Sequence, residues 1–186
     1  SHAHLLGIGF ARLDVNLMGT TSYQEVVDAV AEAVKTRAPG EWIQGRGWHE
    51  EKWTSLPADA VRGFPTHEAL SAVSPENPVA LRRADGHAVL ANAKALALLG
   101  IDRETRTPEG GEIIRDAEGH PTGVFVDNAG SLVTPEARTD EETRRALVLA
   151  MEECLEKGVT SLTDAGAGVE VLELYRAFAA RGDLRV

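Results

Sequence analysis

The sequence is poor in cysteine and contains no long apolar run. Its 186 residues include one cysteine, so no internal disulfide can form, and we expect a cytoplasmic location. The cysteine, Cys154, lies in a helical pattern beside apolar residues, which favours a small buried hydrophobe over a reactive thiol. No stretch of about 18 apolar residues occurs, and the first residues lack the pattern of a signal peptide. We therefore expect neither a membrane span nor a secretory leader.

Positive charge is also scarce. Lys and Arg total 19 against 29 Asp and Glu, which gives a formal net charge of -10 at pH 7. Such a charge repels phosphate backbones and anionic membrane surfaces, so we expect no nucleic-acid or membrane partner. Apolar residues make up 43% of the chain, which is typical of a globular domain able to bury a core.

Apolar periodicity and turn residues predict a mixture of helices and strands. Helices are predicted over 22–37, 92–100, 139–157 and 168–182, and strands over 41–48, 77–83, 159–166 and from 183 onward. A hairpin is predicted around 117–119. Ser22 is expected to cap the first helix, with Glu25 completing a capping box. The succession of helix, glycine and strand in the last third is typical of βα repeats around a parallel sheet.

Two histidines near the start form the first candidate metal site. His2 and His4 flank one small residue, and in an extended segment alternate side chains share a face, so both imidazoles could reach one metal at about 2.1 Å. Such a pair is a weak signal by itself and does not complete a site. Ser1 and His2 could also be the remnant of an expression tag. Because candidate ligands begin at residue 2, we expect coding sequence upstream.

Five segments, read together and in order, carry a family resemblance. They are "SHAHLLGIG", "GRGWHEEKW", "NPVALRRADGHAVLANAKAL", "GGEIIRDAEGHPTGVFVDNA" and "CLEKGVTSLTDAG". The chain resembles the amidohydrolase superfamily along essentially its whole length, in the branch of YtcJ-like hydrolases and N-substituted formamide deformylase. The resemblance implies an α/β fold, namely a partial metallo-dependent hydrolase (β/α)8, TIM-like barrel. It also implies that residues 1–186 are a fragment of the catalytic domain, with a small α+β insertion at approximately 45–125.

The resemblance further implies a metal-dependent hydrolase acting on the C–N bonds of non-peptide amides through a metal-activated water. A divalent metal, zinc in the expected case, would be bound by His2 and His4, and the substrate would be a small amide-type molecule. Two more histidines and the general-base aspartate are expected beyond Val186, so we expect this chain to be inactive alone. Because an unfinished barrel exposes apolar edges, we also expect self-association.

Two other classes of protein are compatible with the same sequence. The chain could be a non-catalytic α/β binding or assembly module on the same scaffold. It could also belong to an isomerase or lyase, because a fold does not fix a reaction.

Two aspartates follow predicted strands. Asp127 stands where relatives commonly carry an acidic residue after "TGV", which implies a metal ligand. The alternative is that Asp127 is an N-cap for the residues that follow it. Asp164 ends the predicted strand 159–166, where barrel enzymes place functional groups. Relatives often show His-Asp there, whereas this chain has Thr163 before Asp164, so a role that needs an imidazole is in doubt.

A loop and a tryptophan complete the candidate residues. Asp85 and His87 lie two apart, and the resemblance places their loop over the barrel mouth, where His87 would contact substrate and Asp85 would orient it. A structural pairing within the loop is the alternative. Trp48 could line the substrate pocket, and a core position is the alternative. Arg82 and Arg83 are expected to end a strand and pair with carboxylates.

Overall fold

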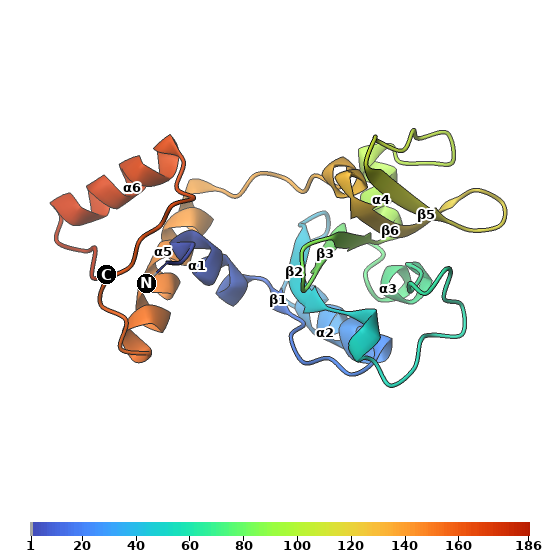
Figure 1. Ribbon diagram of the computed structural model, residues 1–186, viewed down its shortest axis with the longest axis horizontal. Coiled ribbons are helices and arrows are strands. Elements are labelled where there is room, and N and C mark those ends of the chain that lie inside the picture. The colour runs from blue at the N-terminus through green and yellow to red at the C-terminus, as the bar shows by residue number, and fades with distance from the viewer. Residues whose placement is uncertain (1) are drawn as a thin grey trace. The chain divides into compact units, whose positions relative to one another are not determined.

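The computed structural model describes residues 2–186, and these form two compact units. The helical unit combines residues 2–13 with 137–186, and the sheet unit consists of Asp14–Glu136. In the sequence, the sheet unit lies between the two segments of the helical unit, as the colours of Figure 1 show. The approximate range 45–125 lies within the sheet unit, and its origin as an insertion into a barrel stays a prediction. Ser1, part of the tag alternative, lies outside the described residues.

The sheet unit is built on a six-stranded mixed sheet with the order β1-β2-β3-β4-β6-β5. The first three strands are parallel to one another and the remaining pairings are antiparallel. The strands are β1 (Val15–Asn16), β2 (Ile43–Trp48), β3 (Val79–Arg83), β4 (Ala88–Ala91), β5 (Gly111–Arg115) and β6 (Pro121–Asp127). The predicted strands over 41–48 and 77–83 and the hairpin around 117–119 are confirmed.

Both faces of this sheet are buried, because successive side chains point to opposite faces. In β3, Val79 and Leu81 join one apolar cluster, while Ala80 between them joins the other. The first cluster includes residues of helices α2 (Tyr23–Val34) and α3 (Glu68–Val73), and the second includes residues of α4 (Ala93–Leu99) and the 3-10 helix η2 (Asn128–Leu132). The sheet is therefore the middle layer of this unit (Figure 1).

Helix termini in the sheet unit follow local sequence rules. Ser22 caps α2 by accepting a hydrogen bond from the backbone N–H of Glu25, as predicted. The capping box also predicts a bond from the backbone N–H of Ser22 to the Glu25 carboxylate. That carboxylate instead accepts from the backbone N–H and the hydroxyl of Thr21, the preceding residue. Asn92 caps α4 and Gly100 ends it with a φ of 65°, both as predicted.

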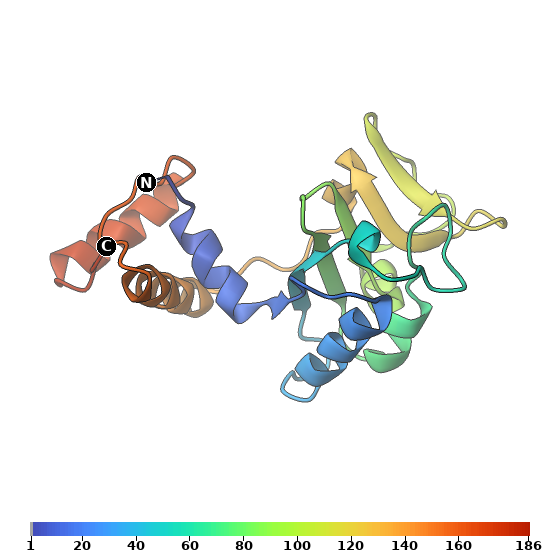
Figure 2. The ribbon, with the colours of Figure 1, turned by 60° about the horizontal axis from the view of Figure 1, so that its bottom comes forward.

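The helical unit contains α1 (Leu5–Leu13), α5 (Asp140–Glu156) and α6 (Val169–Ala180), which share one apolar cluster. Figure 2 shows α5 nearly end-on beside α1 and α6. The predicted long helix is confirmed in α5, which begins with a capping box formed by Thr139 and Glu142. Cys154 is a buried member of the cluster, as expected. Among residues 2–186, no helix has the length and apolarity needed to cross a bilayer.

Two predicted strands of this unit are corrected. Residues 159–166 form a single parallel bridge, between His2 and Thr163, and residues 183–186 have no strand pairing. A strand is stable only where neighbouring strands satisfy its backbone groups, and one bridge does not make a ladder.

Helix α1 was not predicted from the sequence, because its two glycines are poor helix formers. Tertiary packing explains it: a Cβ atom at Gly9 would lie 1.8 Å from the carbonyl oxygen of Ala146. Gly9 thus allows the backbone of α1 to approach α5 closely, and burial of Leu5 in the shared cluster stabilises the pair.

Candidate functional site

The two histidines at the start of the helical unit lie side by side. The ring centroids of His2 and His4 are 5.2 Å apart and the ring planes are inclined by 81°. The backbone between them is held by the N–H of Ala3, which donates to the carbonyl oxygen of Thr163 at 3.1 Å. The predicted sharing of one face is therefore present, while the role of the two imidazoles as metal ligands stays a prediction.

Asp164 lies directly beside this histidine pair. Its Oδ1 is 3.5 Å from Nδ1 of His4 and accepts a 3.1 Å hydrogen bond from the backbone N–H of Gly166. Its Oδ2 accepts from the backbone N–H of Leu5 at 3.1 Å and from the hydroxyl of Tyr175 at 2.9 Å. Asp164, which the sequence marked as a functional position, thus lies beside His4.

Burial and hydrogen bonding set the protonation of this cluster. Burial disfavours the charged form of Asp164, but the bonds from Tyr175, Leu5, Gly166 and His4 outweigh it and hold the pKa of Asp164 below its usual value. Burial, followed by the bond to Asp164, raises the pKa of the Tyr175 hydroxyl well above its usual value. At neutral pH Asp164 is therefore a carboxylate and Tyr175 remains a proton-bearing donor.

The histidine pair fits a divalent metal as two of its ligands. Neutral imidazole nitrogens are common zinc donors, and both rings are exposed. Within residues 2–186, no group of three or more His, Cys, Asp or Glu side chains is arranged to hold a metal ion. His2 and His4 therefore offer two donor nitrogens, and their role as metal ligands stays a prediction.

A second candidate site, in the sheet unit, pairs His87 with Asp127. Nδ1 of His87 lies 2.8 Å from Oδ1 of Asp127, and the backbone N–H of Asp127 donates to the carbonyl oxygen of His87, also at 2.8 Å. Asp127 precedes η2 and occupies its N-cap position, as the alternative predicted, but its side chain does not cap η2 with a hydrogen bond.

Both partners line an open pocket of about 530 Å³ at the end of β6. Its other residues include Arg82, Val89 and Val133. Both side chains are more than half exposed. The pocket offers an imidazole, a carboxylate and apolar walls, which are the groups that can orient a small polar molecule.

Asp127 has a strained backbone. Its φ of 49° and ψ of -124° lie in a region that side chains rarely adopt, and such strain costs about 1–3 kcal/mol. Asp127→Gly should relieve it and lose only an exposed ion pair, so we expect the free energy of unfolding to rise by about 1 kcal/mol in urea denaturation. His87→Ala, which removes the same ion pair without changing residue 127, is the control and should not stabilise. A less stable Asp127→Gly variant would show that the carboxylate matters more than the strain.

Asp85 is paired within its own loop. Its two carboxylate oxygens accept hydrogen bonds from the Arg83 guanidinium at 3.0 and 2.8 Å, and Oδ1 also accepts from the backbone N–H of His87. Arg83 donates as well to Glu50 at 2.6 Å, so its expected pairing with carboxylates is confirmed. Arg82 instead donates to the carbonyl oxygen of Gly86 at 3.4 Å. The loop-pairing alternative for Asp85 is therefore the arrangement present, and substrate orientation by Asp85 stays a prediction.

This pairing predicts a pH dependence of stability. The hydrogen bonds from Arg83 lower the pKa of Asp85 from 3.8 to about 2. A depressed folded-state pKa stabilises the fold above the unfolded pKa, and the contribution disappears as pH falls from about 4 to about 2. Asp85→Asn should therefore lower the free energy of unfolding by about 1 kcal/mol at pH 6. The difference from the parent protein should shrink in urea titrations at pH 3, and a constant difference would contradict the pairing.

Trp48 lies in the core of the sheet unit. It is fully buried, stacks on Trp53 with 6.1 Å between ring centroids, and donates its indole N–H to the carbonyl oxygen of Leu81 at 2.9 Å. The proposed place on a substrate-pocket wall is thereby corrected in favour of the core alternative. The reason is physical, because a large aromatic whose polar atom finds a backbone partner is stable inside.

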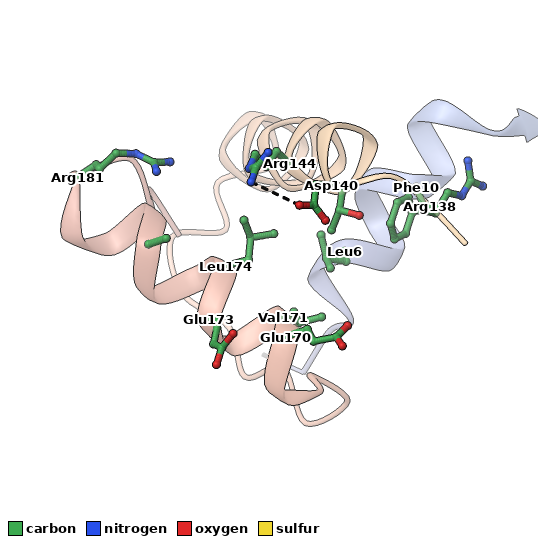
Figure 3. A pocket seen from close by; sticks show the side chains of 12 residues that line it. Leu6, Phe10, Arg138, Asp140, Arg144, Glu170, Val171, Glu173, Leu174 and Arg181 are labelled. Atoms are coloured by element: carbon green, nitrogen blue, oxygen red, sulfur yellow. Dashed lines mark ion pairs between the residues drawn. The ribbon is translucent and has the colours of Figure 1, made fainter. Parts of the chain in front are cut away.

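The helical unit also contains a pocket of about 660 Å³ between its helices (Figure 3). Leu6, Phe10 and Leu174 supply apolar walls, and charged side chains stand around them. Arg144 faces Asp140 at 3.8 Å, the ion pair drawn as a dashed line. No histidine or cysteine lines this pocket among the described residues, so it does not resemble a metal centre.

The whole chain, residues 1–186, matches the family described as Amidohydrolase family. The chain therefore belongs to the amidohydrolase family, as the ordered motifs indicated.

Three curated proteins illustrate the relationship. The chain is 38% identical over 168 residues to Protein LONG AFTER FAR-RED 3 of Arabidopsis thaliana, covering 89% of the chain and 28% of the relative. It is 33% identical over 162 residues to Putative amidohydrolase YtcJ of Bacillus subtilis, covering 86% and 30%. It is 33% identical over 194 residues to N-substituted formamide deformylase of Arthrobacter pascens, covering 99% and 34%. The chain thus spans about a third of the length of these relatives.

Two solved structures resemble the fold along the entire chain. Both are described as uncharacterized metal-dependent hydrolases, one from Pyrococcus furiosus and one from Pyrococcus horikoshii. The TM-scores are 0.66 and 0.68, at sequence identities of 25% and 23%, and the chain covers 35% and 34% of the two structures. The arrangement of α/β elements is therefore one that these larger proteins contain.

Proposed function

We propose that this chain is part of a metal-dependent hydrolase that cleaves C–N bonds of small non-peptide amides, with His2 and His4 as two ligands of a divalent metal, zinc in our proposal. The observation that carries the proposal is the pair of imidazoles 5.2 Å apart, with the Asp164 carboxylate beside them. Similarity to an N-substituted formamide deformylase and to two structures described as metal-dependent hydrolases supports the reaction class.

The chain's own residues would divide the work between binding metal and binding substrate. A bound divalent metal supplies Lewis acidity toward an amide carbonyl and lowers the pKa of water. His2 and His4 would hold it through ring nitrogens. His87 would contact substrate through its imidazole and Asp85 would orient it, a role that is supported by the likeness of their loop to the family motif.

Asp127 also remains a candidate metal ligand, on the strength of its position after "TGV". The Asp127→Gly variant that tests backbone strain answers this question too. If Asp127 is a ligand, the variant should bind less metal than the parent protein while its fold is retained. Unchanged metal content would leave Asp127 as a partner of His87 alone.

The proposal includes a partial TIM-like barrel whose remaining ligands lie outside these 186 residues. It is supported by the coverage of only 28–34% of the curated relatives and by the parallel bridge between His2 and Thr163. We accordingly expect the isolated chain to be inactive. Self-association of the chain is a further part of the proposal, supported by the exposed Val169 and Leu172 on α6. A cytoplasmic location is also proposed, on the single buried cysteine.

Product analysis with a panel of formamides, cyclic imides, ureas and amino-acid amides tests the reaction class in the full-length gene product. Metal-dependent release of amine or acid is the expected result. The second candidate is a non-catalytic binding or assembly module, and it is favoured by the lack of a three-ligand group within residues 2–186. A protein that binds these amides without turnover, with and without added zinc, would support that module instead.

A further inference from the structure

We infer that Asp164 is a positioning residue that holds the His4 ring ready for metal binding, and that Tyr175 fixes Asp164 in place. The inference rests on the proposed function and deepens it, because it assigns roles to residues around the ligand pair. Asp164 and Tyr175 come from neighbouring segments, the Asp164 loop and helix α6, and lie 11 residues apart. His4, in contrast, lies near the start of the chain.

The bonds of Asp164 show that it is anchored. Three donors hold its carboxylate: the hydroxyl of Tyr175 from α6, the backbone N–H of Leu5 at the start of α1, and the backbone N–H of Gly166. The Asp164 side chain is 11% exposed, whereas the His4 side chain is 67% exposed. A carboxylate held by three hydrogen bonds therefore lies beside a ring that is open to solvent.

The same bonds argue against Asp164 as a metal ligand. Oδ2 already accepts two hydrogen bonds and Oδ1 accepts one while facing His4. Within residues 2–186, Asp164 belongs to no group of three or more His, Cys, Asp or Glu side chains that could hold a metal ion. What Oδ1 does face is Nδ1 of His4, in an ion-pair contact of 3.5 Å that is longer than the usual hydrogen bond.

This geometry selects the nitrogen of His4 that would bind metal. A carboxylate facing Nδ1 favours a proton on that atom, which leaves the lone pair on Nε2, on the opposite side of the ring. Metal-binding histidines in proteins commonly donate their other ring N–H to such a carboxylate, which fixes the ring orientation. A carboxylate partner of this kind also makes the opposite ring nitrogen a better electron-pair donor to a metal.

The backbone at Gly166 also positions the His4 ring, because the ring packs against it. A Cβ atom at residue 166 would lie 2.7 Å from Nδ1 and 2.9 Å from Cε1 of His4, which is too close. The ring therefore packs on the backbone of the loop that also contains Asp164. Gly166→Ala would push the exposed ring aside at little cost to the fold, because the residue displaced is a solvent-accessible side chain.

Zinc affinity of the full-length gene product, measured by competition with a chromophoric chelator, tests the inference. Asp164→Asn should weaken zinc binding by about 10- to 100-fold, the usual effect of removing such a partner. Gly166→Ala should weaken it to a similar extent with an unchanged unfolding midpoint, and Tyr175→Phe should do so less. Asp183→Asn is the matched control, because Asp183 pairs with Arg181 in an exposed contact of the same unit.

A spectroscopic signature separates positioning from support of the fold. In metal-free protein, the imidazole ¹⁵N shifts of His4 should report a proton on Nδ1, and Asp164→Asn should shift the tautomer balance toward Nε2–H. Unchanged shifts and unchanged zinc affinity in Asp164→Asn and Gly166→Ala would overturn the inference and leave Asp164 as a support for α1. If Asp164→Asn does not fold, Gly166→Ala decides by itself. Failure of the parent protein to bind zinc would instead overturn the proposed function, and the inference with it.

Discussion

Replacing His2 and His4 together with alanine is expected to remove most of the bound metal from the full-length gene product and to lower its hydrolysis in the same proportion. Loss of one partner behind a ligand costs about 10- to 100-fold in metal affinity, so loss of two ligands should cost at least as much. Both rings are exposed, so the fold should tolerate the change. Elemental analysis of the purified variant, together with amide turnover, measures both effects.

The control for this experiment is His120→Ala. His120 is an exposed histidine in the β5–β6 turn of the sheet unit, where it faces Asp116 at 3.4 Å. It is distant in sequence from both His2 and His4. It should retain full metal content and turnover. If the double variant keeps its metal as well, the histidine pair is a surface feature or a tag remnant, and the proposed metal centre loses its observed ligands.

Asn92→Ala is expected to be the most destabilising single substitution in the sheet unit that we consider, with a loss of about 3 kcal/mol in the free energy of unfolding. The Asn92 side chain is fully buried. Its carbonyl oxygen accepts from the backbone N–H groups of Val79 and Ala95, and its amide donates to the carbonyl oxygens of Ser74 and Asn77. Alanine would leave these four backbone groups without their partner, and an unsatisfied buried group costs about 1–3 kcal/mol.

Urea denaturation measures this loss, and Asn128→Ala provides the comparison. Asn128 is exposed and donates one hydrogen bond to the carbonyl oxygen of Glu109, so its removal should cost less than about 1 kcal/mol. Equal losses for the two variants would mean that water replaces the bonds of Asn92. In that case the asparagine would not be the link that joins β3 to the start of α4.

The elements that sequence predicted well are those with local determinants. Asn92 and Gly100 bound α4, and Thr139 with Glu142 begins α5, because caps depend on residues three or four apart. Helix α1 depends on the contact of Gly9 with Ala146, which are distant in sequence, so its local pattern did not reveal it. The predicted strand 159–166 failed for the converse reason, since a strand needs neighbours that its own sequence does not specify.

The candidate sites show the same division. The spacing of His2 and His4 was sufficient to place both rings on one side, and the end of a predicted strand marked Asp164. Nothing in the sequence linked Asp164 to Tyr175, because the hydroxyl reaches it only after α6 folds back. Trp48 was ambiguous since an aromatic suits a pocket wall and a core equally, and only its buried bond to Leu81 decides.

The metal content of the full-length gene product, purified without chelators and then incubated with zinc, tests the central claim most directly. We expect at least one equivalent of tightly held divalent metal per chain, retained through dialysis. A protein that remains metal-free after this treatment, while folded, would contradict the assignment of His2 and His4 to a metal centre and with it the proposed hydrolase.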